Sequence, residues 1–409
     1  IAGAMLCAIL SDTVIFKSPT CTPADKAAAA ELAEIAGIED IEALGMELFT
    51  AKSAVKGVAA RDLIMRDFKD FNMSGSKVGI GQLELVDLKL LEDRIPELLA
   101  DLAALKAGKH VYTEKPLAMT FAEGKELVEL AKEKGLLIGC APDTFLGGRL
   151  QNIRELIDSG RLGRITGGGA WFVGHGYEFH HPAPAFFYQP GAGPLYDMGP
   201  YYVTALLSLL GPVRRVCAMA TRAAQTRTVP SGPAKGTVLP VDVDTHINAI
   251  LEFCSGAQVT LTCSFDVWDS ELPRMELYGT EGTVLIDEKD PIAGPNLFGG
   301  DTLMRTPGEY RWADPERRPE NVDTPWPVVP NCHPFNSVSH AENPRGIGLV
   351  DLAYALQNGR TPRASGDMAL HSLEVMECIL RSAREHVFCE TTTTFEQPKA
   401  LPLSFPEEN

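Results

Sequence analysis

The sequence predicts an α/β protein in which part of a parallel sheet is followed by an antiparallel sheet. Between residues 110 and 140, two apolar segments flank one amphipathic helix, which is the spacing of a βαβ unit. Beyond residue 240, apolar and polar residues alternate with a period of two, as in antiparallel strands that cover one face. The 409 residues are enough for two or three domains.

The composition is that of a globular protein with an acidic surface. Hydrophobic residues make up 45% of the chain, and 37 basic against 54 acidic side chains give a formal net charge of −17. Such a charge repels phosphate backbones and argues against a nucleic-acid partner. The nine cysteines include no Cys-x-x-Cys pair, so we expect neither a disulfide framework nor a zinc site. The apolar runs 1–10 and 201–210 are too short to span a bilayer, so we expect no membrane segment.

The first hundred residues contain few clear signals of strands or of the turns that connect them. We interpret the apolar run 1–10 as a buried first strand, and the Ala- and Glu-rich residues 22–38 predict a helix. A dinucleotide-binding domain should open with a GxGxxG turn, but Gly79-Ile80-Gly81 lacks the third glycine and is interpreted as a loop. We expect a cytoplasmic location. The chain has no initiator Met, so export through a removed upstream segment stays an alternative.

The βαβ unit follows a helix predicted over residues 98–106. A short strand over 110–113 leads to Thr120-x-x-Glu123, a capping box that begins the next helix. Residues 136–140 are continuously apolar, as in a strand that is buried on both faces.

The second half of the chain has a different pattern. An amphipathic helix near residue 150 precedes two alternating strands, 247–253 and 259–265, which a Ser-Gly turn joins. The Pro- and Asp-rich stretch 287–345 predicts long excursions, and an apolar stripe predicts a last helix over 367–386.

Lys115 is the first candidate for chemistry. The tripeptide Glu114-Lys115-Pro116 follows a parallel strand, and open α/β sheets bind ligands at the carboxyl ends of their strands. An ammonium there can donate to a substrate hydroxyl or carbonyl and stabilise a developing alkoxide. An ordinary surface lysine is the alternative.

Asp197 and Tyr201 are the second candidates, at the start of a helix predicted over 200–210. Their spacing of four residues brings both side chains to one side of a helix, within reach of one substrate. The alternatives are a helix-capping carboxylate for Asp197 and a half-buried aromatic residue for Tyr201.

Residues 174–188 contain three histidines and several aromatic rings. Ring faces together with imidazole and hydroxyl donors suit a polyhydroxylated ring such as a sugar, so Tyr177, His180, His181 and Tyr188 are candidate substrate residues. The histidines lack metal-ligand spacing, and we expect no metal site. Aromatic core packing is the alternative for the phenylalanines of this segment.

Three segments resemble signatures of the Gfo/Idh/MocA family of oxidoreductases, which includes glucose–fructose oxidoreductase and inositol dehydrogenase. They occur in the family's order across about residues 98–389. They read AGKHVYTEKPLAMTFAEGKELVELAKEKGLLIGCAPDTFLGG, GAGPLYDMGPYYVTALLSLLGPV and RGIGLVDLAYALQNGRTPRASGDMALHSLEVMECILRSA.

The resemblance implies an N-terminal Rossmann domain with a doubly wound parallel sheet and a C-terminal α+β domain with an open, largely antiparallel sheet. The expected boundaries are 1–145, 146–365 and a C-terminal helix and tail over 366–409 that return to the first domain. It also implies NAD or NADP as cofactor, and a Lys115–Pro116 peptide bond that is cis. Lys115, Asp197 and Tyr201 would be catalytic, and Glu114 and Lys115 would lie by the nicotinamide.

The family's glycine-rich turn is the point of departure. In register with that turn, Leu6 and Ala8 replace two glycines, and Ala8, Ile9 and Leu10 would have to approach the pyrophosphate. Either this chain has lost dinucleotide affinity, or residues 1–97 are a poorly determined sequence.

The resemblance leads to one main functional hypothesis, hydride transfer between NAD(P) and a secondary hydroxyl of a sugar or sugar-like substrate such as a cyclitol or glycoside. One alternative is an enzyme of the same fold that uses tightly bound NAD transiently, in epimerisation, elimination or glycosidic cleavage. The other is a catalytically silent partner subunit. The half-apolar second sheet predicts a homodimer or homotetramer.

Overall fold

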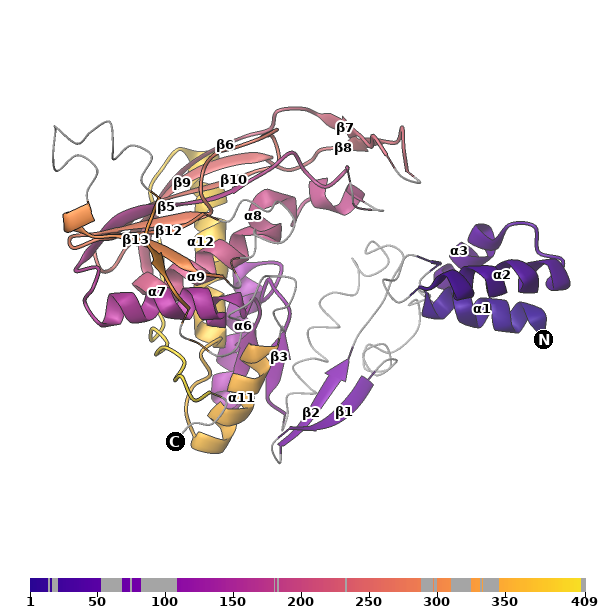
Figure 1. The fold of residues 1–409 in the computed structure, drawn as a ribbon, viewed down its shortest axis with the longest axis horizontal. Coiled ribbons are helices and arrows are strands. Elements are labelled where there is room, and N and C mark those ends of the chain that lie inside the picture. Colours follow the sequence, from indigo (N-terminus) through magenta and orange to yellow (C-terminus); the bar gives the residue numbers. More distant parts are fainter. Residues whose placement is uncertain are drawn as a thin grey trace. The chain divides into compact units, whose positions relative to one another are not determined.

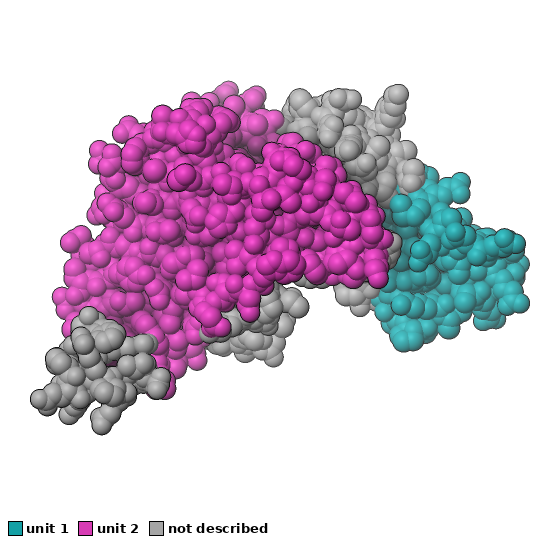
Figure 2. Space-filling model, turned by 90° about the horizontal axis from the view of Figure 1, so that it is seen from above, with its two compact units in different colours: residues 1–107 teal, residues 108–409 magenta. Residues whose placement is uncertain are grey.

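The computed structural model describes residues 1–13, 15–16, 21–52, 68–73, 76–81, 109–179, 181, 184–231, 234–287, 297, 300–309, 325–331, 333 and 346–405. Contacts divide the chain into two compact units, residues 1–107 and residues 108–409 (Figure 2). The predicted boundaries at residues 145 and 365 stay predictions.

The described part of the first unit contains a small helical core. Its buried residues include Leu6, Leu10, Ala29 and Phe49. The second helix begins at a capping box in which the Thr22 side chain accepts a hydrogen bond from the amide of Asp25, and the helix predicted over 22–38 is thereby confirmed. The helices are α1 (Ala2–Asp12), α2 (Pro23–Ala36) and α3 (Ile41–Lys52).

The strand predicted over residues 1–10 is wrong, because these residues form helix α1. Leu6 and Leu10 are four residues apart, so they share one helix face, and both are fully buried. The rest of the run is mostly Ala, Met, Leu and Cys, and Ile9 is its one β-branched residue inside the helix. In a short apolar run, periodicity alone cannot distinguish a buried strand from a buried helix. Here the helix propensity of the residues decides.

The loop predicted at Gly79 and Gly81 is also wrong. Both glycines lie in strand β2 (Ser76–Gly81), which pairs antiparallel with β1 (Phe68–Met73). The pairing aligns Gly79 with Asp70. The helix predicted over 98–106 lies outside the described residues.

The second unit begins with the predicted βαβ unit. Strands β3 (Val111–Thr113) and β4 (Ile138–Cys140) are parallel and adjacent, and helix α6 (Phe121–Glu133) connects them. The capping box between Thr120 and Glu123 is present, and all three residues of β4 are buried. This unit is the part of the predicted parallel sheet that the described residues contain. The Lys115–Pro116 peptide bond is cis, as expected.

A nine-stranded sheet forms the larger part of the second unit (Figure 1). Every neighbouring pair is antiparallel except β5 and β10, so the predicted open, largely antiparallel sheet is confirmed. A separate two-stranded sheet pairs β7 (Thr226–Thr228) with β8 (Val238–Pro240). In spatial order, the large sheet consists of β14 (Val328–Val329), β13 (Thr302–Arg305), β12 (Thr283–Ile286), β11 (Met275–Gly279), β5 (Ile165–Val173), β10 (Gln258–Ser264), β9 (His246–Phe253), β6 (Val213–Thr221) and β15 (Cys389–Glu390).

Helices cover one face of the large sheet and connect it to the βαβ unit. Helix α12 contacts β6, α9, α6 and β4, so it packs on both parts (Figure 1). The predicted helices near residue 150, over 200–210 and over 367–386 are confirmed as α7, α9 and α12. The helices are η2 (Thr144–Leu146), α7 (Gly148–Asp158), η3 (Pro184–Tyr188), α8 (Gly193–Asp197), α9 (Gly199–Leu210), η5 (Pro307–Glu309), α11 (Ile347–Asn358) and α12 (Gly366–Glu385). In the described part of the chain, none of the helices is long and apolar enough to cross a membrane.

Candidate functional site

Lys115 lies just beyond the carboxyl end of β3, and its side chain is 17% exposed. Its ammonium donates a hydrogen bond to the main-chain carbonyl of Asp197 at 2.6 Å, and lies 3.4 Å from the Oδ1 atom of the same residue. The amide of Lys115 donates to the Oε1 atom of Glu114 at 2.9 Å. The lysine is therefore held in place across the 82 residues that separate it from Asp197 in the sequence.

Asp197 and Tyr201 meet Lys115 from the junction of two helices. Asp197 is the last residue of α8, and α9 begins at Gly199, with Pro200 in its first turn, where a missing N–H costs no hydrogen bond. The ring of Tyr201 faces the lysine, whose Nζ atom lies 5.3 Å from the ring centroid. The structure thus brings together the three residues predicted to be catalytic. Their catalytic role stays a prediction.

Tyr177 adds a fourth group to this site. Its hydroxyl shares a hydrogen bond with Asp197, and its ring packs against Phe187 at 4.3 Å and Phe265 at 5.4 Å between centroids. Burial raises the pKa of the Tyr177 phenol well above its usual value, and the negative charge of Asp197 adds to this effect. The phenol therefore stays protonated and acts toward Asp197 as a donor.

A buried arginine fixes the segment that carries Tyr177. Arg227, from β7, donates to Oε1 of Glu178 at 2.7 Å and also to Asp266. It donates further to the main-chain carbonyls of His175, at 3.1 Å, and Phe265, at 2.7 Å. The side chains of Arg227 and Glu178 are 9% and 4% exposed, so these charges compensate one another with little help from water.

The other predicted substrate residues have different surroundings. Tyr188 is fully buried, its hydroxyl donates to Glu178, and its ring faces Arg227 at 5.3 Å. His181 is half-buried, with its ring 5.3 Å from that of Phe186. His180 lies outside the described residues. The structure therefore joins Tyr177, and not Tyr188, to Asp197.

The sequence analysis missed the residues that hold this segment. Arg227, Glu178 and Asp266 are single charged residues in separate strands and loops, and no local spacing marks them as partners. Trp268 was also missed: it is 75% exposed and stacks on His175 with 3.3 Å between ring centroids. An isolated Trp in a polar stretch was the one available signal.

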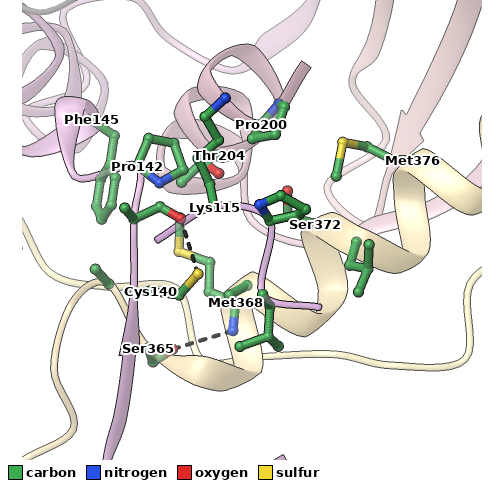
Figure 3. A pocket seen from close by; sticks show the side chains of 16 residues that line it. Lys115, Cys140, Pro142, Phe145, Pro200, Thr204, Ser365, Met368, Ser372 and Met376 are labelled. Atoms are coloured by element: carbon green, nitrogen blue, oxygen red, sulfur yellow. Dashed lines mark hydrogen bonds between the residues drawn. The ribbon is translucent and has the colours of Figure 1, made fainter. Parts of the chain in front are cut away.

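A small, largely apolar pocket opens beside Lys115 (Figure 3). Its walls come from the Glu-Lys-Pro turn, the end of β4, α9 and α12. Cys140 lines it, and its thiol hydrogen-bonds to the carbonyl of Ala141 at 3.0 Å. Burial raises the pKa of this thiol, with a further contribution from the charge of Glu114, so the thiol is protonated and a poor nucleophile.

The residues predicted to receive a dinucleotide fit it only in part. Glu114 is exposed at the end of β3, which suits the nicotinamide end. Ala8, Ile9 and Leu10 lie inside helix α1, and Leu10 is fully buried in the helical core. A pyrophosphate needs a glycine turn with free amides, whereas these amides belong to helical turns. Residues 8–10 therefore do not form a phosphate-binding turn.

A known family matches the central part of the second unit, including six strands of the large sheet. Residues 150–285 match the family model described as the GFO/IDH/MocA C-terminal domain. Over these residues the chain is similar to a GFO/IDH/MocA C-terminal domain. The family resemblance expected from the sequence is thereby confirmed for this part of the chain, from α7 to β12.

Solved structures agree with this assignment at the level of the fold. The chain resembles an NAD-binding oxidoreductase from Klebsiella pneumoniae with a TM-score of 0.57 and 20% identity, over 72% of this chain and 77% of that one. It resembles levoglucosan dehydrogenase in complex with NADH and L-sorbose with a TM-score of 0.57 and 19% identity, over 76% and 84%. These likenesses agree with the fold class that the sequence predicts.

A different family matches the earlier part of the chain. Residues 46–128 match the DHHA2 domain. A probable manganese-dependent inorganic pyrophosphatase of Archaeoglobus fulgidus is 50% identical over 129 residues, which are 31% of this chain and 40% of that protein. The enzyme of Methanocaldococcus jannaschii is 52% identical over 94 residues, 23% and 31%. The chain spans well under half the length of these relatives.

The sequence analysis did not anticipate this likeness. It interpreted the first 97 residues as an atypical or poorly determined dinucleotide-binding segment. The segment around Gly79 lies within the DHHA2 match, so its sequence is similar to that of another family. This accounts for the missing glycine-rich turn. Within the described residues, no group of three or more His, Cys, Asp or Glu side chains is placed to hold a metal ion.

Proposed function

We propose that the chain is an oxidoreductase that transfers a hydride between NAD or NADP and a secondary hydroxyl of a sugar or sugar-like substrate. The observation that carries the proposal is the Lys115 ammonium, which lies at the carboxyl end of a parallel strand beside the Asp197 carboxylate and the Tyr201 ring. Supporting it is the fold shared with levoglucosan dehydrogenase, whose structure holds NADH and L-sorbose.

In this proposal each side chain has one task. The Lys115 ammonium donates to the substrate oxygen and stabilises the negative charge that develops there. Asp197 balances the charge of that ammonium. In the direction of oxidation the Tyr201 oxygen accepts the proton of the substrate hydroxyl while the phenol passes its own proton to water, and reduction runs these transfers in reverse. A bound nicotinamide supplies the hydride acceptor. No phosphate contact is assigned to residues 8–10, which do not fit one.

Substitution of two residues tests the proposal. The full chain is assayed with NAD and with NADP against a panel of sugars and cyclitols. Lys115→Ala and Tyr201→Phe should each lower kcat by about a hundredfold or more, while circular dichroism stays that of the wild type. Unchanged turnover in both variants would refute the assignment.

Two measurements separate the alternatives. An enzyme that uses NAD transiently should retain the nicotinamide on purification, visible in the absorbance of the denatured supernatant. A silent subunit should show no thermal shift with millimolar NAD or NADP, because only a ligand of the native state raises stability.

A second candidate function follows from the 50% identity to manganese-dependent inorganic pyrophosphatase. The candidate activity is hydrolysis of pyrophosphate with Mn²⁺ by the N-terminal part of the chain. Phosphate release from pyrophosphate, measured on the full chain with Mn²⁺ and with a chelator, tests it. Phosphate release that the chelator abolishes and that Tyr201→Phe, a substitution outside the matched residues 46–128, preserves would support this function, and an absence of release would refute it.

A further inference from the structure

Trp268, His175 and Phe179 form an exposed aromatic platform. The indole of Trp268 stacks on the imidazole of His175, with 3.3 Å between ring centroids and 13° between ring planes. The ring of Phe179 meets the other two edge-on, 6.0 Å from Trp268 and 5.7 Å from His175. Trp268 is 75% exposed, so the indole face opposite His175 is open to water. A large ring face that is ordered and yet open to water indicates a binding surface.

The main chain holds the aromatic platform in place. One residue before each of the two stacked rings, the amide of Val267 donates to the carbonyl of Gly174 at 3.0 Å. The buried Arg227 donates to the carbonyls of His175, at 3.1 Å, and Phe265, at 2.7 Å, and so joins the same two loops a second time. A ligand that stacks on the indole therefore loses little affinity in ordering the protein.

The aromatic platform lies at the same edge of the large sheet as the proposed site. Strands β5 and β10 are parallel neighbours, and the loops that follow them carry His175 and Trp268. Tyr177, two residues after His175, packs its ring on that of Phe187 in η3 at 4.3 Å. Helix α8, which ends at Asp197, packs against both η3 and β10. Contacts between neighbouring elements thus connect the aromatic platform to the Asp197 end of α8.

The chemistry of the aromatic platform suits a neutral sugar ring. The face of an aromatic ring is negative, so it attracts the C–H groups on one side of a pyranose. Burial lowers the pKa of His175, and the charge of Arg227 acts in the same direction, so the imidazole behind the indole is neutral at pH 7. Asp269 and Glu271, exposed in the loop of Trp268, repel an anionic ligand and offer acceptors to sugar hydroxyls.

We propose that the aromatic platform binds a second sugar ring of the substrate, so that the enzyme acts on a glycoside or short oligosaccharide in preference to a free monosaccharide. The sugar unit that is oxidised lies at Lys115, and a further unit stacks on the open face of Trp268. This inference rests on the proposed function and deepens it, because a second ring has meaning only where a first sugar unit binds at Lys115.

Calorimetric titration of the full chain tests the aromatic platform without turnover. The probes are the disaccharides cellobiose, maltose and lactose, each compared with glucose and galactose. The wild type should bind at least one disaccharide about tenfold more tightly than its single units. Trp268→Ala should abolish this difference, and Trp268→Phe, which keeps a ring face, should retain most of it. Because the side chain is exposed, circular dichroism should stay that of the wild type in both variants.

Phe388→Ala is the matched control. Phe388 is 68% exposed, lies beside β15 and faces Arg215, so its substitution should leave every sugar affinity unchanged. Oxidation assays with NAD and NADP give a second measurement. The ratio of kcat/KM for the disaccharide to kcat/KM for its single unit should be about ten in the wild type and about one in Trp268→Ala, with the change in KM.

Three results would overturn the inference. The first is a wild type that binds no disaccharide more tightly than its single units, and the second is a disaccharide affinity that Trp268→Ala leaves unchanged. The third is a smaller sedimentation coefficient in Trp268→Ala, which would assign the aromatic platform to a contact between copies of the chain. If the wild type oxidises no sugar, the proposed function fails, while calorimetry still decides whether the aromatic platform binds a second ring.

Discussion

The ammonium of Lys115 lies closer to the main-chain carbonyl of Asp197, at 2.6 Å, than to the carboxylate of that residue, at 3.4 Å. Asp197 is the last residue of α8, and the final carbonyls of a helix have no partner within the helix. The main chain of Asp197 therefore positions the lysine, while its side chain balances the charge. The position of the Lys115 ammonium therefore depends on the carbonyl oxygen of Asp197, whereas its charge is balanced by the carboxylate of the same residue.

This division predicts that Asp197→Asn separates the two effects. The carbonyl remains, so Lys115 should stay in place and the melting temperature should change by less than about 3 °C. The countercharge is lost, so kcat for the proposed hydride transfer should fall by about a hundredfold. Asp158→Asn, on the exposed end of α7, should leave kcat within about twofold of wild type. Equal kcat in all three proteins would contradict the prediction.

Arg227→Met should destabilise the fold. The substitution leaves Glu178 and Asp266 buried without their cation, which costs about 3–5 kcal/mol of unfolding free energy. Urea denaturation measures it. Arg214→Ala, at a 62% exposed side chain that pairs with Glu252, should change the same free energy by less than about 0.5 kcal/mol. If Arg227→Met lowered the unfolding free energy by less than about 1 kcal/mol, water would have to solvate the carboxylates of Glu178 and Asp266.

His371 predicts a loss of stability in mild acid. Burial lowers its pKa to about 4, although the charge of Glu374 opposes this, and its Nε2 atom accepts a hydrogen bond from the amide of Val213. In the unfolded chain a histidine titrates near 6.5. Between these pH values the unfolded chain binds a proton that the folded chain does not. The contribution of His371 to the unfolding free energy is therefore complete above pH 6.5, and about 3 kcal/mol of it is lost as the pH drops to 4.

Urea denaturation at pH 7, 6, 5 and 4.5 measures this dependence. His371→Gln should be less stable at pH 7 but should lose much of the slope. His386→Asn removes an exposed imidazole at the end of α12, and its curve should follow that of the wild type. If the unfolding free energy of His371→Gln fell with pH as steeply as that of the wild type, a different group would be responsible for the pH dependence.

The parts of the fold that the sequence predicted correctly depend on local interactions. The capping box of Thr120 and Glu123 and the turn at Ser255-Gly256 involve residues close in sequence, whose spacing carries the signal. Lys115 and Asp197 were found because each sits at a marked element boundary. Residues 1–10 were misassigned because their apolar run fits a buried strand and a buried helix equally well.

The missed parts depend on contacts between distant residues. Arg227 meets Glu178 and Asp266 only after β7, the segment that follows β5 and the end of β10 have come together. The hydrogen bond between Tyr177 and Asp197 has the same origin. Tyr177 and Tyr188 look alike in the sequence, and only packing separates the site residue from the core residue.

The uncovered face of the large sheet supports the proposed homodimer or homotetramer. Helix α12 packs on β6, where Val216 and Ala218 are buried, while the alternate side chain Met219 is 71% exposed. On the adjacent strand β9, Ile250 is 51% exposed. These apolar side chains share the sheet face opposite α12, because successive strand residues point to opposite sides. In a symmetric pair of identical faces, Met219 and Ile250 would both lose contact with water, which favours self-association through this face.

The double variant Met219→Lys/Ile250→Lys should therefore dissociate the oligomer. Two lysines on each face place like charges opposite one another across a symmetric interface, which costs several kcal/mol when they lose water. Sedimentation velocity at about 10 μM should show an oligomer for the wild type and a monomer for the variant. Val238→Lys changes a 58% exposed residue of β8, outside the large sheet, and should leave the sedimentation coefficient unchanged. A monomeric wild type, or an oligomer in all three proteins, would exclude this face as the interface.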